Sequence, residues 1–282
     1  MILIADSGAT KTDWVAVEKD NSMHKYETAG INPYFLKPPE IKEILEKELL
    51  PFLDGNRVEN VFFYGSGCST EKKRFIIEEA LENVFPAGRF EVYHDLLGAA
   101  HALFGDKPGI ACILGTGSNS CYYNGNDIVE NITSLGYIYG DEGSGASMGK
   151  KLITAFLKDQ FPVEIKKRFD VKYDLNIEKI LDATYNQPKP NQFFSSFSMF
   201  LSENISHPFI REIVLTSFDE FFENQAGKYS VINEVPLSFV GSVSFVFEKE
   251  LKEVAKKRGL KIEKIEKNPI DGLVKFYKNK KY

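Results

Sequence analysis

The first segment of the chain that could do chemistry is a polar turn after a short apolar run. The turn and its flanks read Asp6-Ser7-Gly8-Ala9-Thr10-Lys11-Thr12-Asp13. Gly8 would let the backbone approach a phosphate closely, and Thr10 and Lys11 add a hydroxyl donor and a positive charge. Asp6 could hold a hydrated magnesium ion, which typically takes one or two carboxylates together with phosphate oxygens. The spacing is not that of a Walker loop, and an ordinary polar hairpin turn remains the alternative.

A second polar turn follows a second apolar run and reads Gly115-Thr116-Gly117-Ser118-Asn119. Its small residues and hydroxyl donors suit either phosphates or a sugar. A glycine-rich turn taken alone is usually only a turn. Because the first turn opens the first half of the chain and this one opens the second half, the pair predicts two hairpins that bind one nucleotide from two sides.

An aspartate lies between an expected strand, Phe90–His94, and an expected helix that begins at Leu96. Asp95 would therefore lie at the end of a sheet, where it could act as a general base for a substrate hydroxyl. Capping the helix is the alternative role for Asp95, and the sequence alone favours it. His94 is expected to point to the opposite face of the strand and to be structural.

Two further glycine-containing segments could contact ligands. The first reads Gly136-Tyr137-Ile138-Tyr139-Gly140-Asp141-Glu142-Gly143-Ser144-Gly145. Asp141 or Glu142 could accept hydrogen bonds from sugar hydroxyls, and Ser144 could cap the helix expected over 146–157. The second, Gly241-Ser242-Val243, follows a buried strand and could pass under an adenine ring, although its signal is poor by itself.

Hydrophobic periodicity predicts the elements that position these residues. Strands are expected over residues 1–5, 14–18, 58–64, 90–94, 110–114, 120–123 and 235–240, and helices over residues 39–53, 71–84, 96–104, 146–157, 248–258 and 270–277. A strand, a Gly/Thr turn and a second strand occur at 4–12 and again at 113–120, which is a weak internal repeat. The repeat predicts two related α/β domains that face each other across a cleft, with a boundary near Gly105–Pro108.

Composition argues against several classes of function. The chain has 282 residues, a net charge of -5, and 43% hydrophobic and 27% charged residues, which gives no charge-based case for binding nucleic acid or an anionic membrane. Its cysteines, Cys68, Cys112 and Cys121, are odd in number and lack the spacing of a zinc site. No apolar stretch approaches the ~20 residues of a membrane helix, and the first apolar run is too short for a signal peptide. We therefore expect a soluble, cytoplasmic protein.

The chemistry-bearing segments, taken in this order, resemble the N-acetylglucosamine kinase branch of the BadF/BadG/BcrA/BcrD ATPase family, in the actin–hexokinase superfamily. The resemblance spans nearly the whole chain and is most specific at residues 6–13, 115–119 and 140–144. It implies an ATP-dependent kinase that uses Mg²⁺ to phosphorylate an amino sugar, N-acetylglucosamine at its 6-hydroxyl.

The fold implied by the resemblance is α/β, with two ribonuclease H-like (actin-like ATPase) domains around a central cleft. The N-terminal domain would comprise residues 1–106 joined by the C-terminal helix 268–282, and the C-terminal domain residues 107–267. An amino sugar is the implied small-molecule partner, with no nucleic acid and no membrane, and a homodimer is left open.

The resemblance also implies roles for single residues. Asp95 matches the catalytic aspartate, and Asp6 lies where Mg²⁺ is held. The residues implied to bind ATP are Gly8, Thr10, Lys11, Gly115, Thr116, Gly241 and Ser242. The residues implied to bind the sugar are Asn32, Ser118, Asn119, Gly136 and Asp141.

The sequence departs from the family at one place that bears on the sugar. Ser134-Leu135 stands where the family usually has Gly-Trp before the glycine that Gly136 matches. The aromatic wall beside the N-acetyl group is then missing, or Tyr137 or Tyr139 replaces it. A pocket opened at Leu135 would suit a bulkier ligand, so N-acetylmuramic acid is the alternative substrate.

Three other readings remain. The first comes from the same group of proteins and is an ATPase that activates a 2-hydroxyacyl-CoA dehydratase and carries an iron–sulfur cluster, but Cys112 and Cys121 do not lie in the cysteine motif expected of such proteins. The second is a non-catalytic sugar-binding sensor, and the third is a structural protein of the actin type. The sugar-binding pattern of Asn32 and Asp141 argues against the third.

Overall fold

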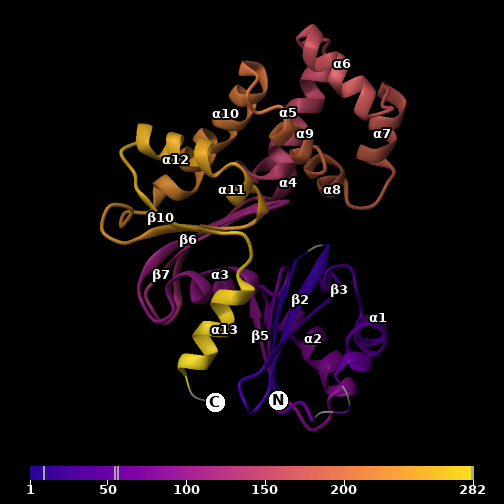
Figure 1. The fold of residues 1–282 in the computed structure, drawn as a ribbon, viewed down its shortest axis with the longest axis vertical. Helices are drawn as coiled ribbons and strands as arrows, with labels where there is room; N and C mark the ends of the chain where they lie inside the picture. Colours follow the sequence, from indigo (N-terminus) through magenta and orange to yellow (C-terminus); the bar gives the residue numbers. More distant parts are fainter. Residues whose placement is uncertain (9, 54, 56, 281–282) are drawn as a thin grey trace. The chain divides into compact units, whose positions relative to one another are not determined.

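The computed structural model describes residues 1–8, 10–53, 55 and 57–280. The chain divides into two compact units, one comprising Met1–Lys107, Gly125–Asp127 and Asn268–Tyr282, the other Pro108–Asn124 and Ile128–Lys267. Within the described residues, each unit contains a five-stranded sheet with helices packed against it (Figure 1).

The sheet of the first unit is formed by β1 (Ile2–Ser7), β2 (Lys11–Val17), β3 (Met23–Ala29), β4 (Asn60–Gly65) and β5 (Arg89–His94). The strand order is β3-β2-β1-β4-β5, with β1 antiparallel to β2 and parallel to β4, which is in turn parallel to β5. Because the carboxyl ends of parallel strands meet at one edge, the sheet gathers Asp6, Gly65 and His94 there.

Side chains of this sheet alternate between two faces, and each face packs against its own helices. One face, with Trp14 and Phe63 in its core, is covered by α1 (Pro38–Ile44) and α2 (Glu71–Val84). The helix predicted over 39–53 is divided, because after Ile44 the chain forms a π-type turn, Leu45–Leu49, and a 3-10 turn, Leu50–Phe52.

The opposite face of the same sheet is covered by two helices that lie far apart in the sequence. Helix α3 (Asp95–Phe104) lies beside the C-terminal helix α13 (Ile270–Asn279), drawn in yellow in Figure 1. Phe62 and Tyr277 stack with ring centroids 3.8 Å apart. The Tyr64 hydroxyl lies 2.6 Å from the Tyr277 hydroxyl and 2.8 Å from His101 Nδ1 on α3, so buried hydrogen bonds tie β4 to both helices.

The sheet of the second unit is formed by β6 (Gly109–Leu114), β7 (Ser118–Tyr123), β8 (Ile128–Ile132), β9 (Leu237–Val240) and β10 (Ile262–Glu266). Its order, β10-β9-β6-β7-β8, repeats that of the first sheet, with β6 antiparallel to β7 and parallel to β9. This common topology confirms the predicted repeat of two α/β units.

Helices make up most of the second unit. They are α4 (Gly136–Tyr139), α5 (Gly145–Leu157), α6 (Val163–Lys172), α7 (Ile177–Tyr185), α8 (Pro190–Ser195), α9 (Ser198–Glu203), α10 (Pro208–Asn224), α11 (Ser242–Val246) and α12 (Glu248–Lys257). Their core is rich in buried phenylalanine rings, among them Phe169, Phe218, Phe221 and Phe222.

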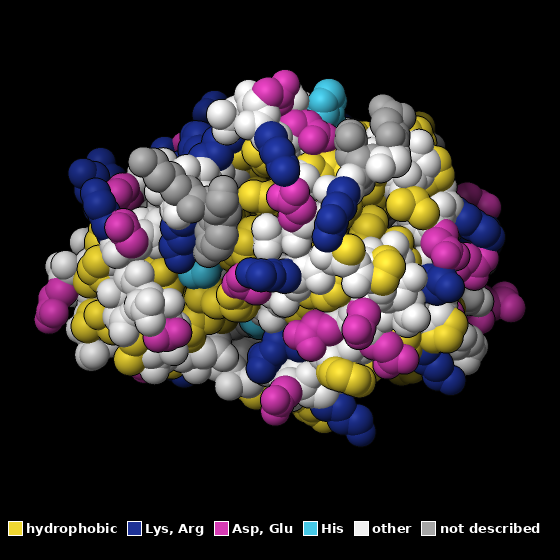
Figure 2. Space-filling view, turned by 90° about the horizontal axis from the view of Figure 1, so that it is seen from below, with side chains coloured by type: hydrophobic (Ala, Val, Ile, Leu, Met, Phe, Trp, Pro, Cys, Tyr) yellow, Lys and Arg dark blue, Asp and Glu magenta, His cyan; other side chains and the backbone are white. Residues whose placement is uncertain are grey.

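Charge is mixed rather than segregated on the face of the protein seen in Figure 2. On this face, Lys and Arg side chains are interspersed with Asp and Glu side chains.

Cys68, Cys112 and Cys121 are buried free thiols. Across the described ranges, no helix combines the length and apolar character needed to span a bilayer.

Candidate active site

The first turn, Gly8–Lys11, joins β1 to β2 and is held by its own backbone. The Gly8 N–H donates to the Lys11 carbonyl (3.0 Å), and Ala9 lies outside the described residues. The Thr10 carbonyl accepts from the Gly30 N–H (3.0 Å). Lys11, which was predicted to bind phosphate, forms ion pairs with Asp13 and Glu27, each at 2.8 Å. These carboxylates use two of the three N–H donors of the Lys11 ammonium, so a phosphate there would share Lys11 with them.

The segment that carries Asn32 is fixed beside this turn. The buried Ser7 hydroxyl donates to the Ile31 carbonyl (3.0 Å) and accepts from the Ile31 N–H (3.0 Å). Asn32 Oδ1 accepts from the Tyr34 N–H (2.9 Å), and its Nδ2 donates to Ser66 Oγ (3.3 Å). The orientation of the Asn32 amide is therefore set by the protein before any ligand binds.

Two aromatic side chains that sequence reasoning missed lie next to Asn32. Tyr34 is 57% exposed and Phe35 67% exposed, although both are large apolar rings. The Lys73 ammonium lies 4.1 Å from the centre of the Tyr34 ring and donates to the Pro33 carbonyl (2.7 Å), which orders the segment. The signal in the sequence was the pair of aromatic residues directly after Asn32-Pro33.

Asp95 is the first residue of α3, but it does not cap the helix. The N-cap is His94, whose Nδ1 accepts the Leu96 N–H at 3.3 Å. The predicted orientation of His94 is wrong, because its Nδ1 lies 3.2 Å from Asp95 Oδ1 rather than on the opposite face. The strand ends at His94, so strand alternation no longer governs its side chain. The alternative reading of Asp95 as the helix cap is wrong, because His94 is the cap.

One oxygen of the Asp95 carboxylate accepts no hydrogen bond from the described residues. This oxygen, Oδ1, is buried, while the side chain as a whole is 26% exposed. Since Nδ1 of His94 already accepts the Leu96 N–H, it carries no proton to offer Asp95. An unsatisfied buried carboxylate oxygen is costly, and such atoms concentrate where a ligand or ion completes the site.

Asp6 lies close enough to two other carboxylates to be affected by them. Burial, followed by the negative charges of Asp95 and Asp13, raises the pKa of the Asp6 carboxyl to about 8, against a smaller opposing effect of Lys11. No set of three or more metal-ligating side chains occurs in the described part of the chain. Mg²⁺ needs only one or two carboxylates when phosphate oxygens supply the other ligands. Its charge would offset the repulsion of Asp6 by Asp95 and Asp13, so these carboxylates fit the ion.

The raised pKa of Asp6 predicts a pH dependence of stability. Folding raises the pKa from 3.8 to about 8, so the folded state favours the protonated acid. The stabilisation from this proton is complete below pH ~4 and is lost as the pH rises towards ~8. In Mg²⁺-free buffer, the melting temperature of the wild type should therefore fall with rising pH relative to that of Asp6→Asn. A pH-independent difference between the two melting curves would contradict this assignment.

The second turn, Gly115–Ser118, joins β6 to β7 and is bonded to the start of α5. The Gly115 carbonyl accepts the Gly145 N–H (2.9 Å), and the Thr116 carbonyl accepts the Ala146 N–H (3.1 Å). The predicted cap is confirmed, because Ser144 Oγ accepts the Ser147 N–H at 3.1 Å. These bonds satisfy the first N–H groups of α5 and fix the turn to the helix.

Asp141 connects the second turn to the segment Gly136–Gly145, called the glycine-rich loop below. It is 8% exposed, and its Oδ1 accepts the Ser118 N–H (3.2 Å). A Cβ atom at Gly117 would lie 2.9 Å from Asp141 Oδ2, so this glycine allows the close approach. Burial raises the pKa of Asp141. The carboxylate predicted to bind sugar hydroxyls thus also positions the turn.

The other predicted sugar contacts lie around Asp141. Ser118 Oγ is buried without a hydrogen-bond partner in the described residues. Asn119 Oδ1 accepts from Asn131 Nδ2 (3.0 Å). Gly136 begins the short helix α4 with a φ of +69°, so the predicted loop contains a helical turn. Ser118 is therefore the member of this set with a buried donor still available for a ligand.

Gly241 is packed directly against the strand that leads into the second turn. Its φ is +129°, and a Cβ atom there would lie 2.2 Å from the Leu114 carbonyl oxygen. Its N–H donates to the Glu266 carbonyl (2.9 Å), and Ser242 is the first residue of α11. The second unit therefore brings the predicted adenosine-side turn and the second turn together.

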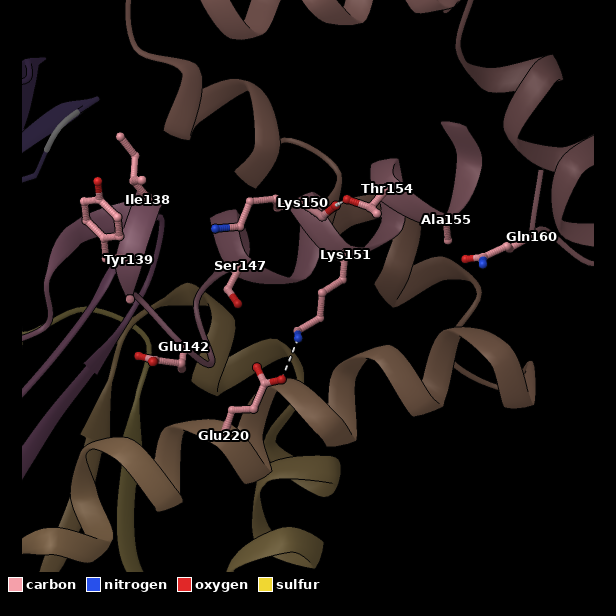
Figure 3. A pocket seen from close by; sticks show the side chains of 11 residues that line it. Ile138, Tyr139, Glu142, Ser147, Lys150, Lys151, Thr154, Ala155, Gln160 and Glu220 are labelled. Atoms are coloured by element: carbon pink, nitrogen blue, oxygen red, sulfur yellow. Dashed lines mark hydrogen bonds and ion pairs between the residues drawn. The ribbon is translucent and has the colours of Figure 1, made fainter. Parts of the chain in front are cut away.

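A pocket of about 460 Å³ opens beside the glycine-rich loop (Figure 3). Its walls come from α4, the loop after it, α5 and α10, and its charged residues are Glu142, Lys150, Lys151 and Glu220. Lys151 pairs with Glu220 at 2.7 Å, and the Lys150 ammonium donates to the Tyr137 carbonyl (2.7 Å). Tyr139 at its rim is 81% exposed. With two lysines and two glutamates the charged lining is balanced, and the pocket suits a polar ligand group.

The chain is similar to solved structures of sugar kinases. A Porphyromonas gingivalis protein provisionally named an N-acetylglucosamine kinase is 41% identical, with a TM-score of 0.94 and coverage of 99% of each chain. A similarly named protein from Chromobacterium violaceum is 16% identical, with a TM-score of 0.68 and coverage of 98% of each chain.

A glucokinase of the ROK family from Streptomyces griseus, solved with glucose and AMPPNP, is 14% identical with a TM-score of 0.60, covering 98% of this chain and 97% of its own. At these lower identities the likeness shows the fold alone. No protein-family model and no curated protein sequence matches the chain.

Proposed function

Because the chain belongs to the N-acetylglucosamine kinase-like branch of the BadF/BadG/BcrA/BcrD ATPase family, we propose that it transfers the terminal phosphoryl group of ATP to the 6-hydroxyl of N-acetylglucosamine. The observation that carries the proposal is the Asp95 carboxylate, which lies at the carboxyl edge of a sheet, is not used as a helix cap and has a buried oxygen that finds no partner among the described residues.

Phosphoryl transfer depends mainly on positioning and on neutralising charge, so the protein has little covalent chemistry to do. Asp95 accepts the proton of the attacking sugar hydroxyl. Bound Mg²⁺, held through Asp6, would neutralise charge on the ATP phosphates. The residues that bind ATP are Gly8, Thr10, Lys11, Gly115, Thr116, Gly241 and Ser242, and those that bind the sugar are Asn32, Ser118, Asn119, Gly136 and Asp141.

Two further parts of the proposal concern organisation. The domains are residues 1–106 with 268–282, and residues 107–267, in keeping with the division into compact units. Since ATP is a cytoplasmic cosubstrate, the enzyme is cytoplasmic.

A coupled assay of ADP release over a panel of sugars tests the function. With N-acetylglucosamine, release should exceed that with glucose or with no sugar, and ³¹P and ¹³C spectra of the product should place phosphate on carbon 6. Equal ADP release with and without every amino sugar in the panel would refute a sugar kinase of this kind.

N-acetylmuramic acid is the second candidate substrate, and the pocket beside the glycine-rich loop favours it. Lys150 and Lys151 line this pocket, and their ammonium groups, which bond to the Tyr137 carbonyl and to Glu220, each have further N–H donors for the carboxylate that distinguishes this sugar. Leu135, which is 64% exposed and has a φ of +61°, stands where the family usually has tryptophan, so the ring of that tryptophan is replaced by a smaller side chain.

The ratio of kcat/KM for the two sugars decides between the candidates. If N-acetylmuramic acid is preferred, Lys151→Met should reduce use of that sugar and spare N-acetylglucosamine. If Lys151→Met changes neither value, the pocket has no part in specificity.

A further inference from the structure

The start of α3 offers two neighbouring side chains that could cap the helix. Asp is among the preferred N-cap residues, and a capping carboxylate spends an oxygen on the N–H groups of the first turn. In this chain the cap is instead the imidazole of His94, through the 3.3 Å bond from the Leu96 N–H. The Asp95 carboxylate is left with its Oδ1 buried and without a hydrogen bond from the described residues.

The His94 ring also limits where the Asp95 carboxylate can go. Its Nδ1 lies 3.2 Å from Asp95 Oδ1, and both side chains are 26% exposed. Because Nδ1 accepts the Leu96 N–H, it has no N–H to donate to the carboxylate. A carboxylate of Asp95 that turned towards the Leu96 N–H would have to displace the imidazole from this hydrogen bond.

We propose that His94 is a positioning residue for Asp95: by capping α3 in its place, it keeps the carboxylate free to accept the proton of the substrate hydroxyl. This inference rests on the proposed role of Asp95 as the base. Without the imidazole, the unsatisfied N–H groups of α3 would attract the Asp95 carboxylate, and the base would point away from the hydroxyl. The loss would then appear in kcat rather than in the affinity for ATP.

The chain contains a matched control for this idea. His207 caps α10 in the same way, with Nδ1 accepting the Phe209 N–H at 3.2 Å. Backbone angles at the two caps are similar, with φ and ψ of -70° and 143° at His94 and of -79° and 128° at His207. The residue after His207 is Pro208, which has no carboxylate to release. Removing either imidazole therefore removes a helix cap, but only one removal affects Asp95.

The test compares His94→Ala, His94→Asn and His207→Ala by kcat, by KM for ATP and for the sugar, and by melting temperature. We expect His94→Ala to lower kcat by ~10-fold or more, as small misplacements of reacting groups do, with KM for ATP unchanged. His94→Asn should restore most of kcat, because Asn is a good N-cap. His207→Ala should lower the melting temperature about as much as His94→Ala and leave kcat at the wild-type value.

Three results would overturn the proposal: wild-type kcat in His94→Ala, an equal loss of kcat in His207→Ala, or no recovery in His94→Asn. Asp95→Asn, assayed in parallel, separates this failure from failure of the proposed function. If Asp95→Asn is inactive while His94→Ala is fully active, only the role of His94 is refuted. If Asp95→Asn is as active as the wild type, the base itself has been misassigned.

Discussion

Replacement of Asp95 by asparagine is expected to lower kcat by at least ~10²-fold, the contribution typical of a general base. The amide keeps the shape of the side chain but cannot accept the proton of the attacking hydroxyl. Because Asp95 is not the cap of α3, the substitution should cost the helix little. Nucleotide affinity, measured by calorimetry, should stay close to that of the wild type.

Asp271→Asn is the control for this experiment. Asp271 also lies in the first turn of a helix of the first unit, but its side chain is 69% exposed and pairs with Lys25 on the surface at 2.7 Å. Exposed pairs contribute ~0–1 kcal/mol, so Asp271→Asn should be fully active. Turnover near the wild-type rate in Asp95→Asn would remove Asp95 from its role as base.

Gly241→Ala is expected both to lower the free energy of unfolding strongly and to weaken ATP binding. The new Cβ would lie 2.2 Å from the Leu114 carbonyl oxygen, and a backbone atom cannot move aside as a flexible side chain can. The φ of +129° adds the strain of a conformation that L-residues rarely adopt. The free energy of unfolding should fall by more than the ~1–3 kcal/mol of backbone strain alone. Displacement of the second turn should also raise KM for ATP.

Gly259→Ala provides the comparison that separates strain from collision. Gly259 follows α12 with a φ of +74°, and a Cβ atom there would meet nothing within 4 Å. This variant should lose ~1 kcal/mol, the usual cost of a left-handed alanine, and keep its KM for ATP. Equal stability losses in the two variants, measured by denaturant unfolding, would show that the contact with Leu114 is unimportant.

Central elements of the fold were predictable because their burial leaves a pattern. Helix α2 spans Glu71–Val84, as its period of apolar residues predicts, and the strands that lead into the two turns were also found. The strands that were missed, β3, β8 and β10, all lie at sheet edges. Edge strands are partly exposed and carry charged residues, as in Met23-His24-Lys25-Tyr26-Glu27-Thr28-Ala29, so they lack an apolar run.

The local parts of the candidate site were predictable to a similar degree, but its long-range contacts were not. Asp6 and Asp95 could be identified because Asp6 lies at the end of the apolar run in β1 and Asp95 directly follows β5. Nothing in the sequence indicates that Asp141 reaches Ser118, 23 residues away, or does so with a φ of +55°. The approach of Gly241 to Leu114 likewise depends on the pairing of β6 with β9. The ligand roles of these residues remain predictions.

The position of α13 has a consequence for how the protein is made. Tyr64 and Tyr277 are hydrogen-bonded although 213 residues separate them in the chain. A ribosome releases the N-terminal segment first, yet the second face of the sheet of the first unit has only α3 to cover it until residues 270–279 have emerged. Domains generally fold in the order of their synthesis. Here the last residue of the second unit is Lys267. The second unit can therefore fold before α13, the last helix of the first unit, has been synthesised.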